Sequence, residues 1–227
     1  MWNELVDPDV RALAALIASP LLIAEHAAPI ATLTDAWRIE SLRLRHRWLL
    51  DLTRRRSACV RTSGGFQRAP TGRYAEALWR FWFAHLPGAR LHAAGLPVKD
   101  ALAVRGEFDF IVSLPGLSEV QHLEMAYKFY LYCPAGRRTF APVRPNAADR
   151  LDRKWQHMLD VATLSQTALG RAALPHDVGR VTPRACLQGW LFYPLATGSA
   201  APIAGVSPAH WRGWWCRSDD WRSHGAP

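Results

Sequence analysis

The sequence predicts an α/β fold with a mixed sheet, because two helical segments enclose a run of extended segments. Apolar residues recur at helical spacing over 72–86 and 146–169. Apolar and polar residues alternate over 107–113 and 120–132, as they do in half-buried strands. Two further extended segments complete the order helix, strand, strand, strand, helix, strand. That order is typical of a mixed α/β core.

The first helix has a clear buried face and clear ends. Thr71 suits its N-cap, and Pro87-Gly88 terminates it. The residues expected on its buried face are Ala75, Leu78, Trp79, Trp82 and Leu86. The second helix begins at Asn146, where Asp149 completes a capping-box arrangement, and Gly170 follows its expected end. Its expected buried face comprises Leu151, Trp155, Met158 and Ala162.

The extended segments predict four strands. A short strand over 89–94 precedes the two alternating segments, and an apolar strand over 184–193 follows the second helix. The turn Leu114–Leu117 joins the alternating pair into a hairpin. In the first strand of that hairpin, alternation predicts Phe108, Phe110 and Val112 on one face and Glu107, Asp109 and Ile111 on the other.

The chain divides into three regions. Residues 1–62 form an N-terminal helical region, and a Gly/Pro/Ser/Thr-rich loop over 62–71 separates it from the core. The α/β core spans 71–193, and a Trp-rich C-terminal segment, 194–227, packs on it.

Composition excludes several classes of protein. The chain has 227 residues, of which 49% are hydrophobic and 21% charged, so it is neither disordered nor of low complexity. Its four cysteines form no CxxC pair, which argues against a zinc ribbon and a secreted disulfide scaffold. The longest apolar run, 12–24, is too short to span a bilayer and lacks a basic leader. We therefore expect a cytoplasmic protein that does not bind membranes.

The charge of the chain indicates a polyanionic partner. The net charge is +9, so DNA is the first candidate partner, although a basic surface also serves solubility or anionic membranes. Only three of the 28 basic residues are lysines, namely Lys99, Lys128 and Lys154. An ammonium group has a pKa that its surroundings can shift, whereas a guanidinium stays charged, so each lysine is a candidate functional residue. Chance is the alternative explanation of so small a number.

The hairpin gathers acidic residues. Partner positions in an antiparallel pair sum to a constant, here about 231 to 233 for ordinary loop lengths. At 233 Asp109 lies opposite Glu124, and at 231 it lies opposite His122. In both registers Glu107, Asp109, Glu124 and Lys128 share a face.

Carboxylates that close together repel, and a divalent cation relieves the repulsion. Mg²⁺ (or Mn²⁺) prefers oxygen ligands, polarises a phosphodiester and activates water, while a lysine stabilises charge developing on phosphorus. The pattern thus predicts a metal-dependent nuclease site. The alternative is the solvated side of a sheet, with Glu124 and Lys128 as a surface ion pair.

The order of these motifs resembles the PD-(D/E)XK nuclease superfamily. The helix bearing Glu76, the GEFDF segment at 106–110 and the LEMAYK segment at 123–128 carry the resemblance. It covers about 71–193 and implies a restriction-endonuclease-like αβββαβ core. It also implies that Asp109 and Glu124 bind the metal, with Glu76 as the helix glutamate and Lys128 as the catalytic lysine. The two helices also resemble an uncharacterised bacterial family placed in this superfamily.

The sequence departs from the superfamily at the lysine. The usual motif, E-x-K, has lysine two residues after the acid, where this chain has Ala126. Lys128 lies on the same strand face, about 6.6 Å farther along the strand. This displacement favours the alternative of a catalytically inactive module on the same fold.

Several further residues are candidates for supporting roles. Glu107 and His122 are expected beside the metal site, although a strand histidine often only supports a neighbour. Lys154, Arg137 and Arg138 are expected to bind DNA phosphates, although solvated charge is the alternative. Arg54–Arg56 likewise either bind the DNA backbone or are solvated charges. Gln188 either forms a hydrogen bond near the site or is an ordinary polar residue of its strand.

The function expected from these observations is hydrolysis of DNA phosphodiester bonds by a metal-dependent nuclease, in repair or defence. The first alternative is a catalytically inactive nucleic-acid- or protein-binding module on the same fold. The second is a membrane-surface or structural protein.

Overall fold

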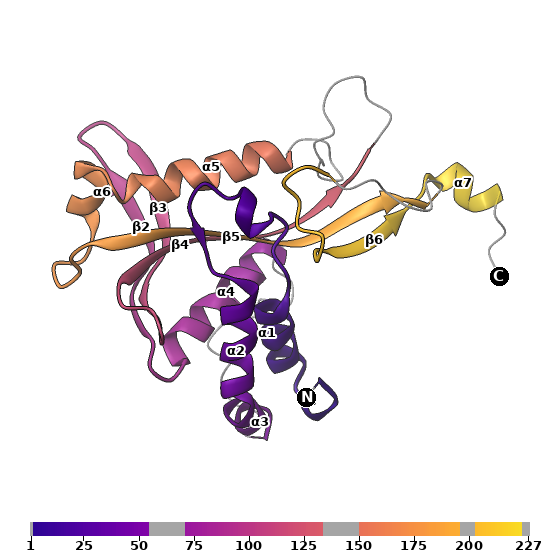
Figure 1. Ribbon diagram of the computed structural model, residues 1–227, viewed down its shortest axis with the longest axis horizontal. Helices are drawn as coiled ribbons and strands as arrows, with labels where there is room; N and C mark the ends of the chain where they lie inside the picture. The colour runs from indigo at the N-terminus through magenta and orange to yellow at the C-terminus, as the bar shows by residue number, and fades with distance from the viewer. Residues whose placement is uncertain (1, 55–70, 134–149, 196–202, 224–227) are drawn as a thin grey trace.

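The computed structural model describes residues 2–54, 71–133, 150–195 and 203–223. Their centre is an open, mixed sheet of six strands with helices on both faces (Figure 1). The main path of the sheet runs β1-β5-β4-β3-β2, and β6 also pairs with β5. The α/β prediction and the expected order of elements are confirmed in this coarse form.

Three antiparallel strands follow one another in the sheet. They are β2 (Arg90–Lys99), β3 (Val104–Ser113) and β4 (Val120–Leu131). In the hairpin of β3 and β4, Phe110 pairs with Leu123 and Ser113 pairs with Val120. Both pairs sum to 233, so the register that sets Asp109 opposite Glu124 is confirmed.

The remaining strands run parallel to one another. The long strand β5 (Val181–Pro194) pairs in parallel with the whole length of β4. Along the other edge of β5 lie β1 (Ala31–Thr32) and β6 (Trp211–Trp215), both also parallel to β5. The Trp-rich C-terminal segment thus extends the sheet through β6, and α7 (Ser218–Ser223) follows it.

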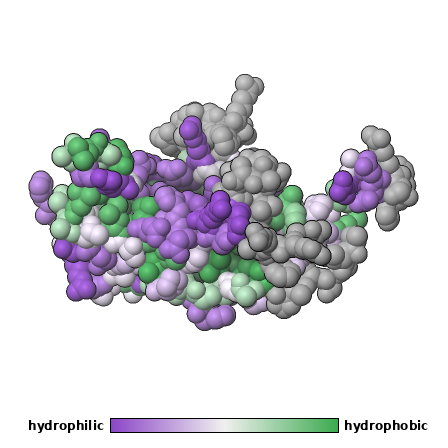
Figure 2. Space-filling model, turned by 90° about the horizontal axis from the view of Figure 1, so that it is seen from above, coloured by the Kyte–Doolittle hydropathy of each residue, from purple (hydrophilic) through white to green (hydrophobic). Residues whose placement is uncertain are grey.

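Two helices cover opposite faces of the sheet. Helix α4 (Thr71–His85) lies below it in Figure 1 and buries the predicted face, including Trp79 and Trp82. Helix α5 (Leu151–Leu164) lies above it and buries Met158 and Ala162. The outer surface of α5 is hydrophilic, as Figure 2 shows from above. The amphipathic spacing of both sequences therefore matches their burial.

The second helix is shorter than its sequence predicts. Helix α5 ends at Leu164, and a separate helix, α6 (Ala168–Ala173), begins after Thr167, whose hydroxyl accepts a hydrogen bond from the Gly170 amide. The prediction that Gly170 follows the helix end is wrong, because Gly170 lies inside α6. A Cβ there would stand 2.0 Å from the Leu164 carbonyl oxygen, so the close approach of the two helices requires glycine. The predicted N-terminal cap at 146–149 lies outside the described residues.

The N-terminal helices share a core with the sheet. They are α1 (Pro8–Ala18), α2 (Asp35–Leu44) and α3 (His46–Arg54), with short 3₁₀ turns at Trp2–Glu4 and Glu25–Ala27. Buried residues of these helices, such as Leu13 and Leu49, belong to the same apolar cluster as Trp82 of α4 and Phe110 of β3. The apolar core of this region is therefore continuous with that of the sheet. The loop expected at 62–71 lies almost wholly outside the described residues.

None of the helices in the described ranges has both the length and the apolar composition that crossing a membrane requires.

Candidate active site

The candidate site lies where β3 and β4 stop pairing. Their ladder ends at the pair Phe110 and Leu123, one position before Asp109 and Glu124. There the backbone amide of Asp109 donates to Glu124 Oε1 at 3.3 Å. The Met125 amide donates to Asp109 Oδ2 at 2.8 Å. Each carboxylate thus accepts from the opposite strand, and the two side chains close a fork between β3 and β4.

The fork changes the face on which one aromatic residue lies. Phe110 contacts Phe83 of α4 at 5.2 Å between ring centroids. Phe108 instead contacts His122 at 4.2 Å, on the side of the sheet that α5 covers. The prediction that Phe108 and Phe110 share a face is therefore wrong. The reason is that the regular ladder ends at Phe110, so the alternation does not continue through Asp109.

Glu124 has a buried histidine partner. His122 Nε2 lies 2.9 Å from Glu124 Oε1, and His122 Nδ1 lies 3.1 Å from the Ala162 carbonyl oxygen in α5. Burial lowers the pKa of His122 to about 4. Burial, with a smaller contribution from Glu107, raises the pKa of Glu124 to about 8. The two pKa shifts both favour the neutral forms of His122 and Glu124. In this neutral pair, His122 Nδ1–H donates to the Ala162 carbonyl oxygen and the Glu124 hydroxyl donates to His122 Nε2.

The second carboxyl group also favours its neutral form. Burial first, and then the charge of Glu124 and of Glu76, raise the pKa of Asp109 to about 7. The Met125 amide and the charge of Lys154 oppose this shift. Burial thus disfavours the ionised form of both acids, and ionising both would place two negative charges at one fork.

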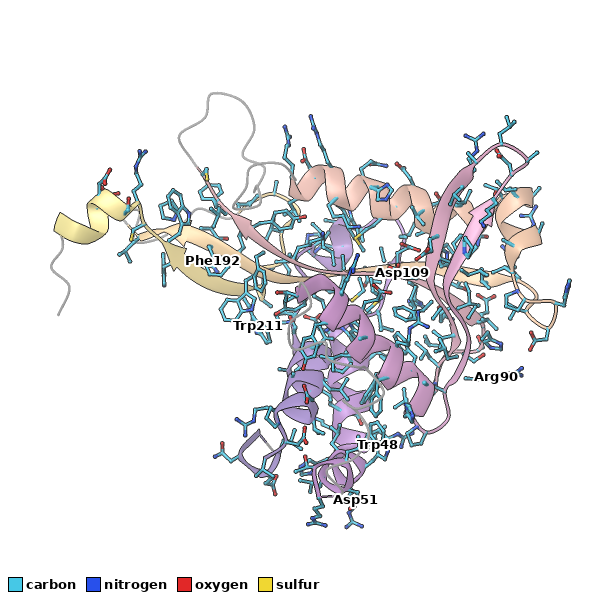
Figure 3. All side chains as sticks on the ribbon, turned by 180° about the vertical axis from the view of Figure 1, so that it is seen from behind. Trp48, Asp51, Arg90, Asp109, Phe192 and Trp211 are labelled. Atoms are coloured by element: carbon cyan, nitrogen blue, oxygen red, sulfur yellow. The ribbon has the colours of Figure 1, made fainter. Side chains whose placement is uncertain are left out.

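The fork opens into a cavity of about 630 Å³ between the sheet, α4 and α5. Asp109 lies near the middle of the sheet, with α5 on one side and α4 on the other (Figure 3). Charged residues from all these elements line the cavity. They are Arg73 and Glu76 from α4, Glu107 and Asp109 from β3, Glu124 and Lys128 from β4, and Lys154 from α5. The structure thus brings together seven of the residues that the sequence singles out, counting His122 beneath the cavity.

Glu76 and Glu107 lie at the rim of the cavity, and both are exposed. They act on the fork through their charge, Glu76 on Asp109 and Glu107 on Glu124. Within the described residues, no group of three or more His, Cys, Asp and Glu side chains is arranged to hold a metal ion. The core of the site is therefore the pair Asp109 and Glu124.

The lysines of the site come from two elements. Lys128 is half-buried and lines the cavity from β4, as alternation predicts. Lys154 also lines it, from α5, and its charge favours the ionised form of both Asp109 and Glu124. The sequence indicates a role in DNA binding for Lys154, whereas its position is beside the carboxylates. The rarity of lysine in this chain is the signal that singles it out.

Other candidates lie elsewhere. Gln188 is buried and donates to the carbonyl oxygens of Leu16 and Ser19, so it anchors the end of α1. Arg54 is exposed and pairs with Asp51 at 3.7 Å. The arginines expected to bind phosphate at Arg137 and Arg138 lie outside the described residues, as do Arg55 and Arg56.

Sequence reasoning missed Arg73 and His157, which line the cavity. Arg73 precedes Glu76 by three residues, and that spacing on a helix places both on one face. His157 follows Lys154 by three residues, so the same spacing places these two residues on one face of their helix.

The oxygen donors of the fork suit a hard divalent cation. Asp109 Oδ1 and Glu124 Oε2 accept no hydrogen bond from the described residues, whereas the other oxygen of each group does. Mg²⁺ commonly binds proteins through one or two carboxylates and completes its shell with water and substrate phosphate. Two carboxylates beside a cavity are enough for such a site.

Comparison with known proteins gives one match. A family model described as "Domain of unknown function (DUF1853)" matches residues 11–226. Searches of curated proteins and of solved structures found no match.

Proposed function

The chain belongs to the DUF1853 family, and we propose that it is a metal-dependent nuclease that hydrolyses DNA phosphodiester bonds at the fork between β3 and β4. The observation that carries this proposal is the pair Asp109 and Glu124. They meet across two strands, face a cavity and have raised pKa values because of burial and negative charge. Asp109 and Glu124 would hold Mg²⁺ or Mn²⁺, which supplies Lewis acidity toward a phosphodiester and lowers the pKa of water.

The cations around the fork suit a phosphate substrate. Lys154 lies close enough to act on both carboxylates, and Lys128 and Arg73 line the same cavity. The N-terminal residues of α4, Thr71 and Gly72, also line it, and a helix N-terminus favours anions. We assign to Lys154 the stabilisation of charge that develops on phosphorus, with Lys128 and Arg73 orienting the strand.

His122 and the rim glutamates have positioning roles in this proposal. His122 fixes Glu124 from beneath the cavity through Oε1, and the other Glu124 oxygen accepts no hydrogen bond from the described residues. Glu76 and Glu107 increase the negative potential that attracts a cation. The fold that the proposal requires is the restriction-endonuclease-like core, which the order of elements and the split hairpin support.

Cleavage of end-labelled DNA tests the proposal. We expect the wild-type chain to cut duplex or single-stranded DNA with Mg²⁺ or Mn²⁺ and not with EDTA. Asp109→Asn and Glu124→Gln should each abolish cutting, whereas Glu40→Gln, an exposed carboxyl in α2, should leave it unchanged. Cutting that survives both fork substitutions would refute the proposed mechanism.

One observation favours a second candidate, a nucleic-acid-binding module without catalysis. The position that carries lysine in the resembled superfamily is Ala126, which lines the cavity without a charge. Such a module would bind DNA with a salt-dependent affinity and would show no metal-dependent cutting at any pH.

A further inference from the structure

A row of aromatic side chains continues from the cavity along the sheet. It begins at Tyr127 and Phe129, which line the cavity, and their ring centroids lie 5.7 Å apart. The ring centroids of Phe129 and Phe192 lie 6.2 Å apart, and those of Phe192 and Trp190 lie 6.1 Å apart in a stacked arrangement. The ring centroids of Trp190 and Trp211 lie 5.3 Å apart. We call these five residues the aromatic row.

The row lies on one face of three neighbouring strands. In the sheet register Phe129 pairs with Trp190, and Trp190 pairs with Trp211. Figure 3 shows Trp211 on the side of the sheet that α4 occupies, where β5 and β6 extend past that helix. All five residues are half-buried, so part of each remains accessible to solvent.

Two contacts hold the rings in place. The Trp190 indole N–H donates to the Tyr127 hydroxyl at 3.1 Å. The ring of Phe192 lies over Gly213, where a Cβ would stand 2.4 Å from ring carbons. Glycine at this position therefore leaves room for the Phe192 ring against β6.

We propose that the aromatic row binds unpaired DNA by stacking against its bases, and so selects single-stranded DNA for the site at the fork. This inference rests on the proposed function. Flat rings on a sheet stack with bases whatever their sequence, but only where those bases are not already stacked in a duplex. The row is continuous with the cavity, so a strand lying on it delivers its backbone to Asp109 and Glu124. The net charge of +9 suits a polyanion rather than an apolar protein partner.

Strand β6 offers a matched control for this proposal. Trp211 and Trp214 lie three residues apart on the same strand, and alternation puts them on opposite faces. Trp214 contacts Tyr193 on the other face and has 52% of its surface exposed. The two tryptophans thus share residue type and strand, and differ in the face that they occupy, with Trp214 the more exposed.

The test is fluorescence anisotropy with a labelled 20-mer of thymidine and with a labelled duplex, in EDTA so that cutting does not interfere. We expect tighter binding to the single strand, and we expect Trp211→Leu and Phe129→Leu each to weaken it about tenfold. Trp214→Leu should leave it unchanged. The leucine variants retain apolar volume, and circular dichroism checks their fold.

Equal effects of Trp211→Leu and Trp214→Leu, or equal affinity of the wild type for both DNAs, would overturn the stacking surface. The outcomes separate the two proposals, because binding is measured without metal. Loss of binding in Trp211→Leu alone supports the row even if the chain never cuts DNA. Metal-dependent cutting with unchanged binding in Trp211→Leu overturns the row and leaves the nuclease proposal intact.

Discussion

His122 and Glu124 share a hydrogen bond 2.9 Å long whose two ends are both buried. The other nitrogen of the ring bonds the Ala162 carbonyl oxygen of α5, so this single side chain connects the fork to the helix above it. The consequence is that the candidate site and the packing of α5 depend on each other.

Replacement of this histidine should therefore affect both stability and the site. We expect His122→Ala to lower the free energy of unfolding by about 1–3 kcal/mol, because Glu124 and the Ala162 carbonyl lose their buried partner. Urea denaturation measures this change. His157→Ala, at an exposed position of α5, is the control and should alter stability by less than about 0.5 kcal/mol. Equal stability of the two variants would contradict the role of His122.

The stability of the metal-free protein should fall as pH rises from 6.5 to 8.5. The pKa values of Asp109 and Glu124 are raised to about 7 and about 8, so the folded state retains protons that the unfolded state has lost. Their contribution to stability is complete below the unfolded pKa of about 4 and is lost as pH rises through the folded values. His122, with a pKa lowered to about 4, acts in the opposite sense but only below its unfolded value of about 6.5.

Thermal melts in EDTA test this dependence. Each group changes stability by at most about 1.4 kcal/mol per pH unit. Glu124→Gln should flatten the decline, because an amide does not ionise. Glu40→Gln, whose carboxyl is exposed, should retain the wild-type slope. A melting temperature that rises between pH 6.5 and 8.5 would show that the fork does not hold its protons.

Divalent cations should stabilise the protein through the fork. Binding to the folded state alone raises the melting temperature with cation concentration, so Mn²⁺ should shift the wild-type melt upward at pH 8. Asp109→Asn and Glu124→Gln should remove the shift, because each removes a charged oxygen donor. A shift of wild-type size in both variants would place the cation elsewhere in the chain.

The three lysines of the chain allow a direct comparison of their roles. Lys154→Met should lower the rate of DNA cutting about a hundredfold, as loss of one donor to a developing negative charge does in other enzymes. Lys128→Met should have a smaller effect. Lys99→Met, at an exposed position on β2, should have none. Rates of DNA cutting at saturating Mg²⁺ distinguish the roles of the three lysines. A larger effect of Lys128→Met than of Lys154→Met would identify Lys128 as the catalytic lysine.

Gly189 should be irreplaceable in β5. Its φ of +138° is unfavourable for other residues, and a Cβ would stand 1.7 Å from the carbonyl oxygen of Lys128, its partner in β4. We expect Gly189→Ala to destabilise the protein by about 1–3 kcal/mol. Gly179→Ala, which meets nothing within 4 Å, is the control. Equal melting temperatures of the two variants would contradict this account.

The local pattern of the sequence was sufficient for the main elements. Helical spacing of apolar residues located α4 and α5, and alternation located the hairpin of β3 and β4, because both periods follow directly from backbone geometry. The ends of the helices were harder to predict from the sequence. Helix α5 ends at Leu164, although the helical pattern of apolar residues continues into α6. The strand β6 has no apolar alternation of its own, since Trp211 and Trp214 lie on opposite faces.

Register and alternation are local properties of paired strands, so the sequence alone was enough to assign Asp109, Glu124 and Lys128 to one hairpin. The end of the ladder at Phe110 and the turn of Phe108 toward α5 became visible only in the folded chain. The same holds for the charge of Lys154 acting on the carboxylates and for the five aromatic rings that form one row. These features depend on the packing of segments far apart in the chain, which no local period records.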